Sequence, residues 1–118
     1  MENIKKNSLK SRKKIEELFN SSQTITQGFI TIYWTYIKNN DTDNSVLFSV
    51  PKKNVPLSTK RNRIKRLLRE SYWRNQHIIN NNPGNLMIAF IYQDSELLDF
   101  KLVEIKIKLI LQRLNEIL

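Results

Sequence analysis

Residues 60–69 constrain the fold most, because six of these ten residues are cationic and the apolar ones recur at helical spacing. With about 100° of rotation per residue, one side of the predicted helix carries Ile64, Leu67, Leu68, Ser71 and Tyr72. The other side carries Arg61, Asn62, Lys65, Arg66 and Arg69, and the border carries Arg63, Glu70 and Arg74. This segregation predicts a helix that buries one stripe and presents a row of cations to an anionic partner.

The positive charge is concentrated in one part of the chain. Of a formal net charge of +9, residues 52–74 carry +8, from nine Lys or Arg against the single Glu70. A second basic group lies at 5–14. A field of one sign on part of a small domain is typical of a protein that binds a polyanion. The alternative is a charged face that serves solubility alone, but solubility favours mixed signs.

The composition excludes several kinds of site. At 118 residues we expect one domain, spanning 1–118, and the absence of Cys excludes disulfides and thiolate metal sites. His77 is the only histidine, and no base has a tuned partner nearby in the sequence, so side-chain hydrolysis is poorly supported. Two glycines cannot supply a glycine-rich phosphate loop. No apolar run has signal-peptide or membrane-spanning length, so we expect a cytoplasmic protein.

The remaining elements flank the basic helix on both sides. Hydrophobic periodicity and turn residues predict helices at 9–19, from Ser58 or Thr59 as cap to about 75, and from 100 onward, with strands at 24–26, 29–37, 45–50 and 86–92. The apolar run 86–92 is typical of an interior strand covered on both faces. This order predicts an α+β two-layer sandwich with a mixed sheet of about four strands. The helix between the last two strands makes a β-helix-β crossover, for which a right hand is the default.

The sequence leaves two interpretations open for each of two residues, Tyr33 and Arg63. Alternation places Ile30, Ile32, Trp34 and Tyr36 toward the core and Tyr33 on the opposite, mixed face. There Tyr33 could stack on a nucleic-acid base or simply pack against its neighbours in the sheet. Arg63 could contact an anionic partner or form a salt bridge with Glu70.

The run 61–70, with sequence RNRIKRLLRE, closely resembles the signature helix of the bacterial ribonuclease P protein subunit. The resemblance extends through 48–53, FSVPKK, and more loosely over most of the chain. It implies a protein that is not itself catalytic, forms a 1:1 complex with a catalytic RNA as a monomer, and assists removal of the 5′ leader from precursor tRNA. It also implies that Mg²⁺ is held by the RNA, and that the β-helix-β crossover is left-handed.

The same resemblance implies roles for particular residues. Contacts with the catalytic RNA are expected from Lys53, Arg61, Asn62, Arg63, Lys65, Arg66 and Arg69. A cleft for the single-stranded leader is expected to include Lys10, Ile15, Phe19 and Tyr33. Ile15 replaces an aromatic residue common in the family, Pro51 replaces a frequent serine, and the link 54–60 is one residue longer and lacks glycine. A general RNA-binding or ribosome-associated protein is the alternative function.

Overall fold

The computed structural model describes residues 23–37, 44–79, 85–96 and 99–118. In this part of the chain the elements are β1 (Gln23–Gln27), β2 (Ile30–Ile37), β3 (Ser45–Ser49), α3 (Ser58–Asn75), the 3₁₀ turn η1 (Gln76–Ile79), β4 (Asn85–Tyr92) and α4 (Phe100–Ile117). The predicted strands and the two later helices are therefore confirmed. The helix predicted at 9–19 lies outside the described residues.

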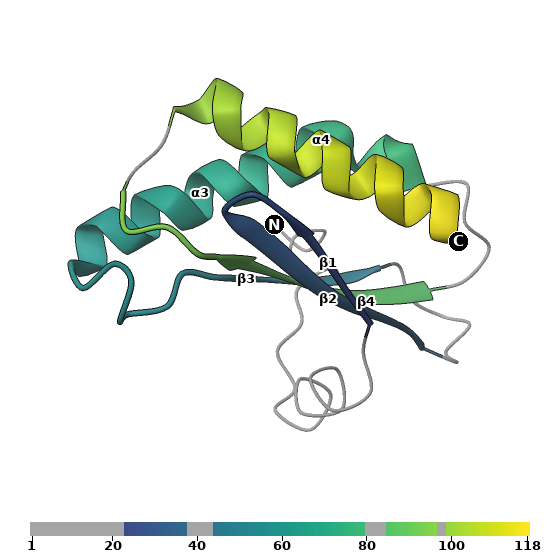
Figure 1. The fold of residues 1–118 in the computed structure, drawn as a ribbon, viewed down its shortest axis with the longest axis horizontal. Helices are drawn as coiled ribbons and strands as arrows, with labels where there is room; N and C mark the ends of the chain where they lie inside the picture. The colour runs from purple at the N-terminus through teal and green to yellow at the C-terminus, as the bar shows by residue number, and fades with distance from the viewer. Residues whose placement is uncertain (1–22, 38–43, 80–84, 97–98) are drawn as a thin grey trace, which may run out of the picture.

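The four strands form one mixed sheet in the order β1-β2-β4-β3. β4 pairs antiparallel with β2 and parallel with β3, while β1 and β2 form an antiparallel hairpin. Both α3 and α4 cover the same face of this sheet (Figure 1). The α+β class with a mixed four-stranded sheet is confirmed. The hand of the β3-α3-β4 crossover stays a prediction.

The main core lies between the sheet and the two helices. On β2 the residues Ile30, Ile32 and Trp34 are buried, and on β4 the alternating residues Leu86, Ile88, Phe90 and Tyr92 join them. The alternation of period two predicted for residues 30–34 is therefore confirmed. Helix α3 contributes its buried stripe of Ile64, Leu68 and Tyr72, and α4 contributes Val103, Ile107, Ile110, Leu111 and Leu114. Leu67, expected on the buried side of α3, is only half-buried at the margin.

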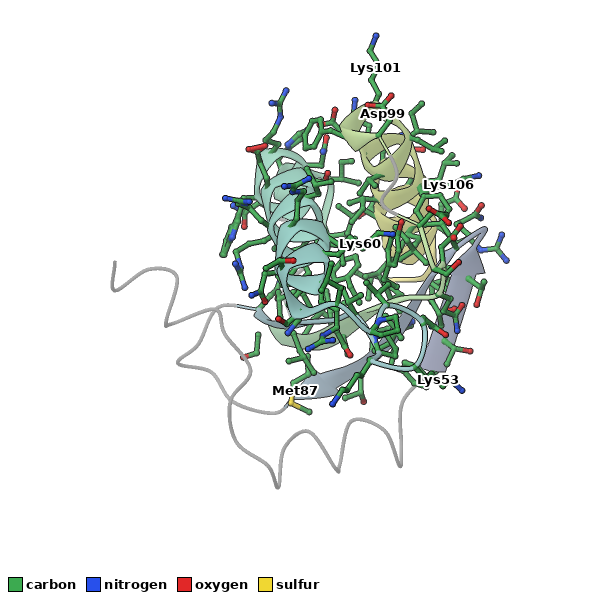
Figure 2. All side chains as sticks on the ribbon, turned by 90° about the vertical axis from the view of Figure 1, so that its left-hand side faces the viewer. Lys53, Lys60, Met87, Asp99, Lys101 and Lys106 are labelled. Carbon is green, nitrogen blue, oxygen red and sulfur yellow. The ribbon has the colours of Figure 1, made fainter. Side chains whose placement is uncertain are left out.

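A smaller apolar cluster lies on the other face of the sheet. Met87 and Ala89 of β4 are buried there, and Tyr33, Leu47 and Ile91 pack against them. Figure 2 shows the Met87 side chain on the side of the sheet away from the two helices. β4 is therefore apolar on both faces, as its continuous apolar sequence predicted.

The start of α3 differs from the prediction. The N-cap is Leu57, in an extended conformation and without a side-chain cap hydrogen bond, so the expected cap at Ser58 or Thr59 is wrong. The carbonyl of Leu57 accepts the first helical hydrogen bond, from the backbone N–H of Arg61, at 3.0 Å. Ser58 and Thr59 are thus already inside the first turn. A favourable capping residue predicts a helix start only to within one or two positions.

The far end of α3 is joined to α4 by a polar contact. Asn75 is buried, and its Nδ2 donates to the Ser71 carbonyl at 2.8 Å and to Glu104 Oε2 at 3.0 Å. The same carboxylate oxygen lies 3.4 Å from Nε of Arg74, whose guanidinium also lies 5.5 Å from the centre of the Phe100 ring. Arg74 is therefore engaged in holding the two helices together.

The buried phenol of Tyr72 makes stability sensitive to alkaline pH. Burial raises the pKa of Tyr72 from 10.0 to about 12, and a side-chain hydrogen bond with Asn44 opposes part of that rise. The folded state therefore holds this proton more tightly than the unfolded state, so its contribution is complete below pH 10 and is lost as pH rises toward 12. Two pKa units correspond to roughly 2.7 kcal/mol.

We therefore expect the stability advantage of the wild-type chain over Tyr72→Phe to shrink steadily above pH 10. Urea unfolding of both proteins at pH 8, 9.5, 10.5 and 11 measures this difference, and Phe supplies a ring of similar size without the titrating group. Other titrating groups are shared by the two proteins and cancel in the comparison. A difference that stays constant with pH would contradict the prediction.

Candidate nucleic-acid interface

The outward face of α3 carries an exposed row of hydrogen-bond donors. Asn62, Arg63, Arg66 and Arg69 are exposed, and Lys65 is half-buried. The helix has no acidic residue in its first turn, and Glu70 is its single acid. Because the opposite side of α3 is buried in the core, these side chains are held on a rigid element. The exposed and buried faces predicted from the helical wheel are confirmed, except that Leu67 and Arg61 are each half-buried.

Arg63, Arg66 and Arg69 have no charge partner within the described part of the chain. The alternative that Arg63 pairs with Glu70 is not observed there, because both side chains are exposed and no ion pair joins them. Their guanidinium groups offer planar forks of N–H donors that match phosphate oxygens. The face of α3 is therefore suited to a phosphate backbone.

Arg69 is additionally placed by an aromatic ring. Its guanidinium carbon lies 5.7 Å from the centre of the Phe48 ring, within the range of a cation–π contact. Phe48 itself stacks on Phe90 at 5.3 Å and meets Tyr72 edge-on at 6.0 Å. The sequence placed Phe48 in a strand and in the run that resembles the family, but it did not indicate this contact, since the contact joins β3 to α3. The position of Arg69 is therefore linked to the packing of the core.

Two cations at the start of the basic stretch are engaged in contacts with loops. Lys60 Nζ lies 3.3 Å from the Ser95 carbonyl oxygen and 3.8 Å from Glu96 Oε2. Figure 2 shows Lys60 between the two helices. Arg61 is half-buried, and its Nη1 donates to the carbonyl oxygens of Val55 and Pro56 at 3.1 and 2.7 Å. Lys60 and Arg61 are therefore engaged within the protein, and the basic stretch has fewer freely projecting cations than its sequence contains.

Lys52 and Lys53 are exposed on a tight turn that follows β3. The Pro51 carbonyl closes this turn by accepting hydrogen bonds from the backbone N–H groups of Asn54 and Val55, each at 3.1 Å. No non-glycine residue in the described chain has a positive φ. The link 54–60 therefore does not need the backbone conformation that glycine favours. Figure 2 shows Lys53 below the helices, at the level of the sheet.

Tyr33 lies on the sheet face opposite the helices. It is half-buried, and cross-strand pairing places it beside Ala89 on β4 and Thr24 on β1. Leu47 pairs with Ala89 on the far side, which completes a row across all four strands. The structure thus confirms the face of Tyr33 but does not test whether a base stacks on it. Lys10, Ile15 and Phe19, the other expected residues of the leader cleft, lie outside the described residues.

Neither a metal-binding cluster nor a membrane-spanning helix is found among the residues that the structure describes. No group of three or more His, Cys, Asp or Glu side chains there is placed to hold a metal ion. None of the described helices is both long and apolar enough to cross a membrane.

The arrangement of these elements matches solved structures of ribonuclease P proteins. The protein from Thermotoga maritima aligns with a TM-score of 0.75 and 22% identity, over 90% of this chain and 96% of that one. The protein from Staphylococcus aureus aligns with a TM-score of 0.75 and 18% identity, over 92% and 94% of the two chains. At these identities the likeness establishes the fold alone.

Sequence comparison identifies the family to which the chain belongs. It is 43% identical over 65 residues to the ribonuclease P protein component of Porphyromonas gingivalis, which covers 52% of this chain and 47% of that protein. The component from Chlorobium phaeobacteroides is 36% identical over 68 residues, covering 54% and 47%. The alignments thus span about half the length of these relatives. The sequence model of the ribonuclease P family matches residues 4–115, and the chain belongs to this family of proteins.

Proposed function

We propose that this chain is the protein subunit of a bacterial ribonuclease P and that it binds the catalytic RNA through the outward face of α3. The observation that carries this proposal is the exposed row Arg63, Arg66 and Arg69, which has no charge partner in the described part of the chain. Asn62 and Lys65 add donors on the same face, and Lys53 adds a cation from the turn after β3. Phosphate contacts of this kind supply affinity and fix orientation.

The protein's part in cleavage is binding and placement. The RNA performs the hydrolysis with Mg²⁺ that it holds itself, and one protein monomer binds one RNA. The 5′ leader of precursor tRNA lies along the sheet face that carries Tyr33, where a ring can stack on an unpaired base, which is worth ~1–3 kcal/mol per base. The further residues proposed for this cleft are Lys10, Ile15 and Phe19. We propose that the protein acts in the cytoplasm.

Reconstitution at low Mg²⁺ tests this function directly. The wild-type chain, added to an in vitro transcript of a bacterial ribonuclease P RNA, is expected to restore removal of the leader from precursor tRNA. The reason is that protein cations replace part of the charge screening that Mg²⁺ supplies at high concentration. The measurement is the single-turnover cleavage rate at fixed low Mg²⁺, with and without the protein.

The controls separate the alternatives. Protein with substrate and Mg²⁺ but without the RNA is expected to give no cleavage, and cleavage in that tube would make the chain a nuclease in its own right. Tight binding to the RNA without any gain in cleavage would instead indicate a general RNA-binding or ribosome-associated protein.

A further inference from the structure

The connection between β3 and α3 is held by a short chain of hydrogen bonds that ends on Arg61. Val55 is at its centre: its side chain is fully buried, its N–H donates to the Pro51 carbonyl, and its own carbonyl accepts from Arg61 Nη1. The same Nη1 also donates to the Pro56 carbonyl at 2.7 Å, the shorter of its two contacts. Lys52 and Lys53 lie inside the turn that the Pro51 carbonyl closes.

Arg61 thus differs from the other arginines of α3 in what its guanidinium does. Its Nη1 donates to two backbone carbonyls, whereas Arg63 and Arg66 are exposed and have no hydrogen bond or ion pair in the described part of the chain. The carbonyls of Val55 and Pro56 precede the N-cap Leu57, so neither accepts a helical hydrogen bond and each needs a donor from elsewhere. A charged donor makes such a bond stronger than a neutral one.

We propose that Arg61 is a positioning residue for RNA binding, which acts by fixing the turn that carries Lys52 and Lys53. Its guanidinium holds the carbonyls of Val55 and Pro56, and this fixes the exit of the turn relative to the first turn of α3. The two lysines are then already in place when RNA binds, so less ordering entropy is lost on binding. The inference rests on the proposed function, since it assigns the turn a role in RNA binding.

Amide hydrogen exchange in the free protein tests the positioning step without any RNA. In Arg61→Gln, exchange at the amides of Asn54 and Val55 is expected to be at least about tenfold faster than in wild type, because local opening of the turn becomes easier. Arg66→Gln is the matched control, since it removes an exposed arginine of the same helix and should leave both amides unchanged. Unchanged exchange in Arg61→Gln would overturn the proposal.

A double-mutant cycle tests whether the effect on RNA passes through the lysines. Arg61→Gln is expected to weaken binding to a ribonuclease P RNA transcript about tenfold in the wild-type background, but less than about twofold in Lys52→Gln/Lys53→Gln, because coupled sites are not additive. Arg66→Gln should cost the same factor in both backgrounds. Equal losses for Arg61→Gln in both backgrounds would identify Arg61 as a direct contact and overturn the proposal.

Arg61→Lys separates charge from geometry. Lysine keeps the positive charge but lacks the planar fork, so it should show fast exchange at the Asn54 and Val55 amides and the same coupling to Lys52 and Lys53. Full affinity in Arg61→Lys without restored amide protection would overturn the proposal. If the wild-type chain itself fails to bind the RNA, the proposed function fails, whereas the exchange result in the free protein still reports on the turn.

Discussion

Replacing Arg63, Arg66 and Arg69 together by Gln is expected to weaken binding to ribonuclease P RNA by at least about a thousandfold, because each charge-assisted hydrogen bond contributes ~1.5–3 kcal/mol. The three side chains are exposed, so the fold should lose little stability beyond the ~0.5–1 kcal/mol of the contact between Arg69 and Phe48. The salt dependence should change with the affinity. If each arginine neutralises one phosphate, the slope of log K against log salt becomes less steep by roughly 2 to 3. Titrations at several salt concentrations measure both quantities.

The matched control removes the same charge from the other helix. Lys101, Lys108 and Arg113 of α4 are exposed, and replacing all three by Gln also lowers the net charge by three. This variant should bind RNA within about threefold of wild type, since long-range attraction between exposed charges is largely screened at physiological salt. Equal losses of affinity in the two triple variants would show that net charge, and not the face of α3, determines binding.

Leu68→Ala is expected to have the opposite effect, with a large loss of stability and little change in RNA affinity. Leu68 is 0% exposed in the main core, so its truncation leaves a cavity that costs about 2–5 kcal/mol. Denaturant unfolding measures the loss, and RNA binding is measured well below the new melting temperature. Leu67→Ala serves as the control, because half-buried Leu67 should cost much less. Similar costs at the two positions would contradict the burial pattern of α3.

The two faces of α3 were predictable because a helix repeats every 3.6 residues. That period alone separates Ile64, Leu68 and Tyr72 from Arg66 and Arg69, and the structure keeps them apart. The alternation of β2 likewise predicted which residues face the helices and that Tyr33 faces away. These features depend on local geometry, which neighbouring residues determine.

The partners of Lys60 and Arg61 were not predictable, because both bind backbone carbonyls, which every residue carries. The sequence therefore contains no signal that distinguishes a cation engaged with a loop from one that projects freely. The contact of Arg69 with Phe48 and the pairing of Arg74 with Glu104 depend on how distant segments pack. The cap at Leu57 was missed because a leucine side chain has no acceptor for the first-turn N–H groups, so nothing in the sequence marks it as a cap.

The order of the strands in the sheet also could not be predicted from the local sequence. It has a consequence for how the chain folds during its synthesis. β4 lies between β2 and β3, yet it is the last strand in the chain. Until residue 92 has left the ribosome, β2 and β3 lack their shared neighbour, and the apolar stripe of α3 lacks most of the surface that covers it. Such non-local pairing is slow to form and prone to aggregation. A nascent chain that ends before β4 therefore carries the arginines of α3 without a fixed surface to present them. The order of synthesis would then delay the proposed RNA binding until folding is nearly complete.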